Sequence, residues 1–284
     1  MKKSNKLFFI GITALFLVPL IIFVAFKYLH EDDFSKNEIS QNLQAISAKS
    51  SSKISEWVLR FSSDVNIVNL DGRFDFIVEP GKFNQLSVVA NKDVYKFIKF
   101  SRNKNVLTIR LQDGSAVSPL NKIKIVLTTP NMNGIMLTGN NHVDVKNIIS
   151  DSLILKMRGD NIARISGSYP YLKLVTAGNS RLDVNIQKAE KIQLMSLGAT
   201  KIILSGTADN FVIWNYGNSL VLAKNLMVNN LIIESNFSFD SKMIVQAKKT
   251  LSATSLGKTE VDYYGNPTIN IGKRNGLLLT KRGE

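Results

Sequence analysis

Hydrophobic and polar residues follow three different patterns along the 284-residue chain. Residues 7–26 are twenty consecutive positions without a charge, residues 31–60 are polar and rich in serine, and from Ser62 onward apolar and polar residues alternate in short runs. A helix of this length spans about 30 Å, the thickness of the hydrocarbon core of a bilayer, and period-two alternation is typical of half-buried strands. The pattern predicts an N-terminal transmembrane helix, a tether and an all-β body.

Charges beside the apolar run predict its orientation. Lys2, Lys3 and Lys6 precede the run, and three acidic residues follow at 31–33. Because lysine and arginine flank membrane helices on the cytoplasmic side, we expect a cytoplasmic N-terminus, a bacterial inner-membrane location and a periplasmic main domain. The alternative is a cleavable signal peptide, whose apolar region is usually about 7–15 residues long. The run is longer than that, and residues 24–26 offer no small-x-small cleavage site.

Glycines in the second half of the chain recur at a fixed interval. Successive members of the column are 19 to 21 residues apart, with Asn236 in the sixth place. The glycines are Gly139, Gly159, Gly178, Gly198, Gly217 and Gly257. A fixed period near 20 residues is typical of a solenoid, and glycine tolerates the positive φ angles of tight corners. The repeat predicts a parallel β-helix of about seven rungs with these glycines as structural corners.

Aliphatic residues keep constant distances from these corners. Positions four before, four after and six after a corner are apolar in most rungs, as at Leu155, Ala163 and Ile165. Stacked rungs would align them into ladders inside the coil, which one rung alone could not bury. In the sixth rung the same spacing assigns Ile232 to the interior and Ile233 to the outer surface.

These patterns divide the chain into five segments. We expect a cytoplasmic stub with the anchor (1–30), a serine-rich tether (31–60), lead-in strands (61–130), repeat rungs (131–267) and a basic C-terminal tail (268–284). The lead-in strands and the rungs together form one β domain, 61–267.

A column of outward-pointing residues is rich in apolar side chains. It lies three positions before each corner, and its apolar members are Met136, Val175, Met195, Trp214 and Ile233. One interpretation is that the N-terminal strands or the C-terminal tail cover this outward stripe. The other is a subunit or partner interface, because exposed apolar patches mark contact sites on soluble surfaces.

A basic run in the lead-in strands is interleaved with aromatic residues. The cations are Lys92, Lys96, Lys99, Arg102 and Lys104, and Tyr95, Phe97 and Phe100 lie among them. This composition favours stacking on nucleic acid or sugar, or a half-buried edge strand with a solvated face. Since the predicted topology places the run outside the cytoplasm, its functional partners would be anionic envelope polymers or lipid head groups, and nucleic acid is disfavoured.

Composition restricts the chemistry that the chain can perform. The chain has no cysteine, two histidines and a formal net charge of +14, which excludes thiolate nucleophiles and cysteine-ligated metals and indicates anionic surroundings. We predict no catalytic, cofactor-binding or metal-binding residues. Asp144, Asp183 and Asp262 share one outward column, but same-column residues two rungs apart are separated by roughly 10 Å, which is loose for the carboxylate pair of a glycosidase.

The chain resembles a known family over about residues 61–267. The matching segments are the strand–turn–strand from Asp64 to Gly81, the strand 106–110, the lead-in 123–130, the first rung 135–139 and the closing segment 261–267. They are similar to the head GIN domain of autotransporter adhesins, found in bacterial envelope proteins. The resemblance implies a β-helix and an adhesin-like role, and it supplies no catalytic residues. The chain departs from the family's usual Ser-Gly rungs, because its first five corner glycines follow other residues.

Together these observations predict a membrane-anchored, non-enzymatic β-helix that binds an envelope polymer, a protein partner or a second copy of itself. The alternatives are a glycan-active β-helix enzyme, which requires convergent acidic residues, and an envelope scaffold that assembles end to end. The polar segments 272–276 and 281–284 disfavour bare stacking ends, because charged edges block strand addition.

Overall fold

The computed structural model describes residues 41–42, 47–51, 54–61, 65–112 and 122–283. Residues 1–40, which include the predicted anchor and the first part of the predicted tether, lie outside the described residues. Within the described ranges, no helix has both the length and the apolar composition needed to cross a membrane.

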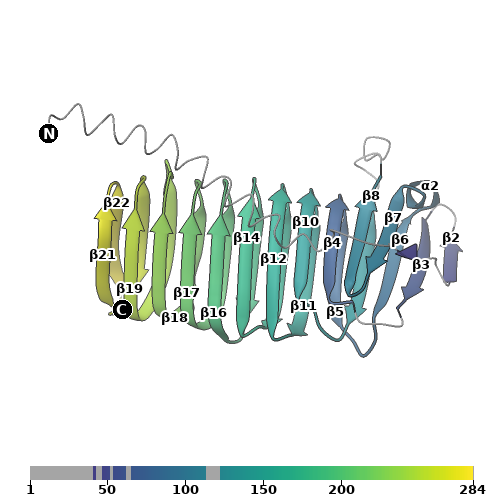
Figure 1. The fold of residues 1–284 in the computed structure, drawn as a ribbon, viewed down its shortest axis with the longest axis horizontal. Coiled ribbons are helices and arrows are strands. Elements are labelled where there is room, and N and C mark those ends of the chain that lie inside the picture. Colours follow the sequence, from purple (N-terminus) through teal and green to yellow (C-terminus); the bar gives the residue numbers. More distant parts are fainter. Residues whose placement is uncertain (1–40, 43–46, 52–53, 62–64, 113–121, 284) are drawn as a thin grey trace. The chain divides into compact units, whose positions relative to one another are not determined.

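The described chain forms a β-solenoid with two faces (Figure 1). Strands of successive turns pair in parallel on each face. The first face contains β4 (Ile67–Gly72), β10 (Gly134–Gly139), β12 (Ser152–Gly159), β14 (Tyr171–Ala177), β16 (Ala189–Ser196) and β21 (Thr268–Arg274). The second contains β5 (Asp75–Pro80), β11 (His142–Ile149), β13 (Ile162–Ser168), β15 (Arg181–Ile186), β20 (Thr259–Tyr264) and β22 (Leu277–Gly283). The predicted all-β solenoid of about seven turns is confirmed.

Three longer strands bend from the second face into the first. They are β17 (Lys201–Asn215), β18 (Leu220–Ser235) and β19 (Ser241–Ser255). The first half of each pairs on the second face, and the second half pairs on the first face of the same sheet. Between β17 and β18 the pairing continues through the bend, from Ser205–Asn225 to Ala208–Val228, whereas between β18 and β19 the register shifts there, between Ala223 and Met227.

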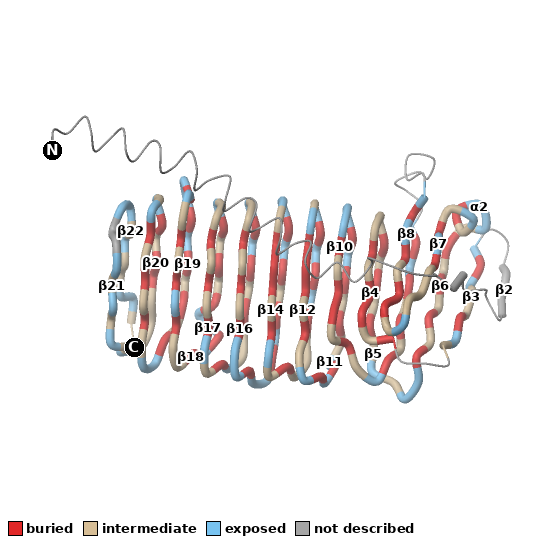
Figure 2. Tube along the Cα trace, in the orientation of Figure 1, coloured by how far each residue is buried: buried red, intermediate tan, exposed pale blue. Residues whose placement is uncertain are grey.

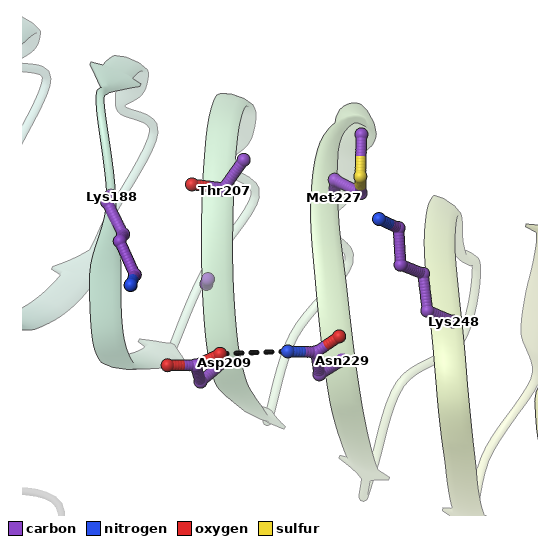
Figure 3. A pocket seen from close by; sticks show the side chains of 7 residues that line it. Lys188, Thr207, Asp209, Met227, Asn229 and Lys248 are labelled. Carbon is purple, nitrogen blue, oxygen red and sulfur yellow. Dashed lines mark hydrogen bonds between the residues drawn. The ribbon is translucent and has the colours of Figure 1, made fainter.

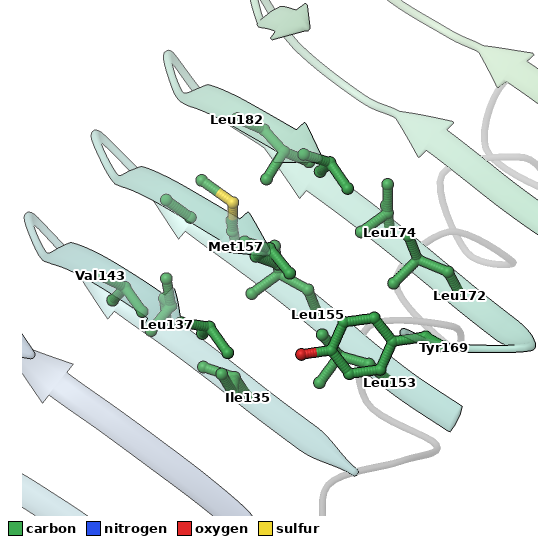
Figure 4. Packing of buried hydrophobic residues seen from close by; sticks show 14 of the residues in the cluster. Ile135, Leu137, Val143, Leu153, Leu155, Met157, Tyr169, Leu172, Leu174 and Leu182 are labelled. Atoms are coloured by element: carbon green, nitrogen blue, oxygen red, sulfur yellow. The ribbon is translucent and has the colours of Figure 1, made fainter. Parts of the chain in front are cut away.

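Aliphatic ladders fill the space between the two faces (Figures 2 and 4). Leu155 pairs with Leu174 on the first face, Ala163 pairs with Leu182 on the second, and each of these side chains is 0% exposed. Since burial of apolar surface stabilises by about 25 cal/mol per Å², and each turn is covered only by its neighbours, the turns are stable only as a stack. The predicted interior ladders are confirmed.

The glycine column lies where the chain turns from the first face to the second. Gly139, Gly159 and Gly178 have φ angles of 101–103°, in the left-handed region that favours glycine. A Cβ atom on Gly159 would lie 2.4 Å from the carbonyl oxygen of Gly139. Two further glycines extend the column, because a Cβ on Gly139 would meet Gly72 and a Cβ on Gly276 would meet Gly257. Successive turns therefore stack too closely at this corner for a side chain.

The sixth turn differs from its prediction. A Cβ on Gly257 would lie 2.3 Å from the carbonyl oxygen of Ser238, so Ser238, not Asn236, occupies the glycine position. β18 gains one residue at a register shift after Leu222, and Phe237, with φ 58°, adds another. As a result Ile233 is 0% exposed, whereas Ile232 is 41% exposed, which reverses the predicted orientation of both.

A ladder of buried polar side chains follows the inner side of the glycine corner. Asn141, Asn161 and Ser180 each lie two residues after a corner glycine and are buried. Asn161 Oδ1 accepts hydrogen bonds from the backbone N–H of Asn141 at 3.0 Å and from Asn141 Nδ2 at 2.9 Å. Ser180 Oγ accepts from the backbone N–H of Asn161 at 3.2 Å. Because buried polar groups require partners, this ladder satisfies backbone groups that the tight corner removes from strand pairing.

Antiparallel strands close the N-terminal end of the solenoid. β8 (Val106–Leu111) and β9 (Lys124–Thr129) pair in parallel with β4 and β5. β7 (Ile98–Asn103) and β6 (Gln85–Asn91) then pair antiparallel with β8 and β9. The outermost elements are β1 (Gln41–Asn42), β2 (Ser47–Ser51), β3 (Ile54–Arg60) and the short helix α2 (Lys92–Tyr95).

Two of the predicted segment boundaries are wrong. Residues 54–60, predicted as tether, form β3, which pairs with β6 and buries Leu59 in the core. Residues 268–283, predicted as a polar tail, form β21 and β22, which pair with β19 and β20 as a last turn. In the last turn Ile269, Leu277 and Leu279 pack against the core, and the neighbouring lysines and arginines obscured that alternation in the sequence.

Tyr169 is buried without a polar partner. Its side chain is 0% exposed and joins the core cluster beside Leu153 and Leu155 (Figure 4), and its hydroxyl has no hydrogen-bond partner in the described part of the chain. We expect Tyr169→Phe to raise the free energy of unfolding by about 1 kcal/mol, because an unsatisfied buried hydroxyl costs about 1–3 kcal/mol. Urea unfolding at pH 7 measures this change.

The same substitution is expected to alter the pH dependence of stability. Burial raises the pKa of Tyr169 above its usual value, so the folded state keeps the phenol proton when the unfolded chain loses it. The stability that this proton provides is complete below the unfolded pKa of about 10 and declines as pH rises above it. Between pH 9 and about 11 the Tyr169→Phe variant should therefore lose less stability than the wild type. A variant that is less stable at pH 7 would contradict the unsatisfied hydroxyl.

Candidate functional site

A shallow hollow lies at the bend that returns the chain from the second face to the first. It has a volume of about 90 Å³. Its lining residues come from neighbouring turns (Figure 3): Lys188, Thr207, Ala208, Asp209, Met227, Asn229 and Lys248. We call this feature the bend groove.

Strand register places small residues inside the bend and polar residues outside it. Ala208, Val228 and Ala247 pair in succession and are at most 4% exposed. The residues that follow Ala208 and Val228, namely Asp209 and Asn229, therefore point outward on adjacent turns. Paired strands lie about 4.8 Å apart, so the outer side chains of successive turns are within hydrogen-bond reach.

Hydrogen bonds between turns fix these outer side chains. Asn229 Nδ2 donates to Asp209 Oδ1 at 2.8 Å (Figure 3). In the adjacent column Asn230 Nδ2 donates to Asn210 Oδ1 at 3.2 Å, and Thr250 Oγ1 donates to Asn230 Oδ1 at 3.0 Å. A carboxylate and amides can each form more hydrogen bonds than these, so the groove presents pre-positioned donors and acceptors to solvent.

Two lysines give the bend groove an excess of positive charge. Lys188 and Lys248 are exposed and lean over the hollow from opposite sides (Figure 3), and Asp209 is the only carboxylate in the lining. Met227 is 37% exposed between them. The groove thus combines cations, a fixed hydrogen-bonding array and an apolar contact.

The predicted outward stripe is only partly present. Met136, Val175, Met195 and Trp214 align on the outer side of the first face. Val175, however, is 1% exposed, and Ile233 faces the interior. The extra residue in β18 places Glu234 beside Trp214 instead. Met136, Met195 and Trp214 are half-buried and do not form a continuous exposed apolar surface.

The predicted basic run belongs to α2, β7 and the loops at the N-terminal end. Lys92, Lys96, Lys99 and Lys104 are exposed, and Arg102 is half-buried. The aromatic side chains pack inward. Tyr95 stacks on Trp57 with 3.8 Å between ring centroids, and Phe100 is 8% exposed. The rings therefore stabilise the end of the solenoid and do not form an open stacking surface, while the four exposed lysines remain accessible.

The acidic column does not assemble a carboxylate pair. Arg164 lies in register between Asp144 and Asp183, and it also contacts His142 at 3.0 Å. Asp262 forms an ion pair with Arg282, with 2.9 Å between Asp262 Oδ1 and Arg282 Nε. Among the residues that the structure describes, no group of three or more His, Asp or Glu side chains could hold a metal ion.

Sequence patterns alone did not single out the bend groove, although a signal was present. Asn210, Asn230 and Thr250 are spaced by 20 residues, and Asp209 and Asn229 share that spacing. Repeating polar residues on the outside of a solenoid mark a polar ladder in the same way that repeating aliphatic residues mark the core. The apolar columns and the basic run were more conspicuous in the sequence.

Comparisons with known proteins agree on the fold. Residues 65–267 match the family described as "Putative auto-transporter adhesin, head GIN domain". No curated protein matches the chain. A structure described as a putative adhesin from Parabacteroides distasonis superposes with a TM-score of 0.71 at 18% identity, covering 81% of this chain and 95% of its own.

Two further solved structures are similar. One, described as a putative adhesin from Parabacteroides merdae, has a TM-score of 0.69 at 16% identity and covers 82% of this chain and 97% of its own. The other, described as a putative lipid binding protein from Parabacteroides distasonis, has a TM-score of 0.68 at 16% identity and covers 82% and 98%. At these identities the likeness establishes the solenoid fold alone.

Proposed function

Because the chain belongs to the head GIN domain family, we propose that it is an adhesin-like module that binds acidic carbohydrate polymers of the cell envelope in the bend groove. The proposal places the solenoid in the periplasm, tethered to the inner membrane by the apolar run 7–26. One observation carries it: the hydrogen-bonded pair Asp209–Asn229 lines the same hollow as two exposed lysines, Lys188 and Lys248.

The chemistry of the groove matches an acidic sugar. Amide and carboxylate groups that are already fixed by their neighbours, such as Asn229 and Asp209, can bond sugar hydroxyls with little loss of side-chain freedom. Lys188 and Lys248 can each pair with a sugar carboxylate, and Met227 can contact the apolar face of a ring. Since the polar ladder repeats from turn to turn, it favours a polymer over a single small molecule.

The groove supports binding more than cleavage. Glycosidases require two carboxyl groups that flank the scissile bond, and Asp209 is the only carboxylate in the lining. Its Oδ1 already accepts a hydrogen bond from Asn229. Asp209 can accept a hydrogen bond from a sugar hydroxyl, but the groove lining contains no second carboxylate that could act with it in catalysis.

We expect the full-length chain, solubilised in a nonionic detergent, to bind polygalacturonate and to bind the neutral polymer dextran at least tenfold more weakly. The double variant Lys188→Glu/Lys248→Glu should reduce polygalacturonate affinity at least tenfold, because it replaces two attractive charges with two repulsive ones. Affinity should also fall as salt is added, since the contacts are exposed. Biolayer interferometry with immobilised polymer measures all three effects.

The matched control is Lys92→Glu/Lys96→Glu, which makes the same charge change in the basic run at the N-terminal end. It should leave polygalacturonate affinity within about twofold of wild type, because it acts only through non-specific charge. Equal loss in both double variants, or loss in the control alone, would refute the groove as the binding site. Equal binding of dextran and polygalacturonate would refute the acidic ligand class.

A further inference from the structure

The two ends of the solenoid finish differently. At the N-terminal end, β6 and β7 cover the first parallel turn with antiparallel strands. At the other end, β21 pairs only with β19 and β22 only with β20 within the described part of the chain (Figure 1). One long side of each last strand therefore presents unpaired backbone N–H and C=O groups, which are a template for strand addition. The cations that we expected to block this end are confined to 273–274 and 281–282, so residues 268–272 and 277–280 carry no charge along the edge.

The interior ladders are also incompletely covered at this end. Leu279 packs against the core but is half-exposed, and Ile271 is half-exposed as well, whereas Val261 and Ala253, their respective partners on the preceding turn, are 0% and 1% exposed. Leu278 is 58% exposed on the same turn. The last turn thus combines unpaired strand edges with exposed apolar side chains, and covering both would be favourable.

The free backbone groups and the apolar side chains belong to the same residues. In earlier turns the backbone carbonyls of inward residues, such as Asn141 and Asn161, accept bonds from the following turn. By the same register, the inward residues Ile271 and Leu279 direct their free backbone groups away from the solenoid. A strand that pairs with them would close the ladder and extend the core in one step.

We propose that a second copy of this chain covers this end, in a two-fold dimer in which β21 of each copy pairs antiparallel with β22 of the other. The two strands are seven residues each, so β21 of one copy matches β22 of the other in length, and a two-fold axis parallel to the strands forms two identical ladders. This axis stacks the glycine bend of one copy on the same bend of the other. The cross-sections of the two copies are therefore superposed. A two-fold axis along the sheet normal would instead stack the glycine bend of one copy on the opposite bend of the other.

The register of this dimer follows from the preceding turn. Ile271 pairs with Ala253 and Leu279 with Val261, and Ala253 and Val261 are each four residues from Gly257. Ile271 and Leu279 thus lie at the same height on the two faces, so the axis brings Ile271 of one copy opposite Leu279 of the other. By the same argument Asn270, paired with Ser252, lies opposite Thr280, paired with Asp262.

The absence of cysteine from the sequence permits a direct test of this register. In the full-length chain in nonionic detergent, the double variant Asn270→Cys/Thr280→Cys should form a disulfide-linked dimer as its main product under mild oxidation. Neither single variant should do so, because each cysteine would face a residue that is not cysteine. The wild type should sediment at twice the chain mass, and Leu279→Lys should halve that mass by placing a charge in the junction.

Thermal unfolding followed by circular dichroism shows whether Leu279→Lys remains folded, and Lys281→Ala, on the same strand, should keep the dimer mass. A wild type that sediments as a monomer overturns the proposal. So does a disulfide dimer that forms equally in either single variant, because it requires a different pairing. The dimer does not depend on the bend groove, so loss of polygalacturonate binding and loss of the dimer are separate results.

Discussion

Replacing Gly159 with alanine is expected to destabilise the solenoid by at least about 3 kcal/mol, because two separate costs combine. The first is conformational, since the φ angle of 101° at Gly159 lies in a region that alanine adopts only with strain. The second is steric, since the added Cβ would lie 2.4 Å from the carbonyl oxygen of Gly139. That oxygen belongs to the backbone and cannot move away without separating two turns.

Urea unfolding of the full-length chain in nonionic detergent, followed by circular dichroism, measures this loss. Gly283→Ala is the matched control, because a Cβ there would only make ordinary contact, at 3.5 Å, with the ring of Tyr264. The control should change the free energy of unfolding by less than about 1 kcal/mol. Equal stability of the two variants would show that the glycine corner is not held as tightly as the stacked backbone requires.

The solenoid could be predicted because its stabilising features repeat. A glycine position without room for Cβ and an inward aliphatic position each recur once per turn, so one pattern is read many times along the chain. The same logic fails where a turn is irregular. The extra residues after Leu222 and at Phe237 shift the sixth turn, and nothing in the sequence distinguishes Asn236 from Ser238 as its corner residue.

The two ends of the solenoid were harder to predict, because each ends the repeat. β3 gains its stability from pairing with β6, 25 or more residues away, which local patterns do not reveal. The last turn has the expected apolar alternation at Ile269, Ile271, Leu277 and Leu279, but it is incompletely covered and rich in cations. A charged segment beyond the clear repeats therefore resembled a tail, although it continues both faces.

The candidate site illustrates a further limit of the sequence. Asp209, Asn229 and Lys248 are neighbours only because the parallel strands bring together residues that are about 20 positions apart in the sequence. The basic run was conspicuous as a local cluster, yet the structure turns its aromatic residues toward the core, as at Tyr95 and Phe100. Local composition therefore suggested an aromatic binding surface at the basic run that the structure does not have. The bend groove could be recognised only from the register of the strands.

Replacing Asn161 with alanine is the substitution with the second largest expected effect, a loss of about 2–4 kcal/mol in the free energy of unfolding. Asn161 is 0% exposed and its Oδ1 accepts the backbone N–H of Asn141 at 3.0 Å. Its Nδ2 donates to the carbonyl oxygen of Arg158 at 2.8 Å. Alanine would leave the backbone N–H of Asn141 buried without its acceptor and would open a small cavity beside it.

A comparison with serine separates the hydrogen bonds from the cavity. Ser180 holds the equivalent place on the next turn, where its Oγ accepts the backbone N–H of Asn161 at 3.2 Å and donates to the Gly159 carbonyl at 2.9 Å. Asn161→Ser should therefore recover about half of the loss seen in Asn161→Ala, since it restores an acceptor for the Asn141 N–H. Asn185→Ala, at an exposed position on β15, should change stability by less than about 0.5 kcal/mol. If serine were no better than alanine in urea unfolding, shape alone would account for the buried polar ladder, and its hydrogen bonds would contribute nothing measurable.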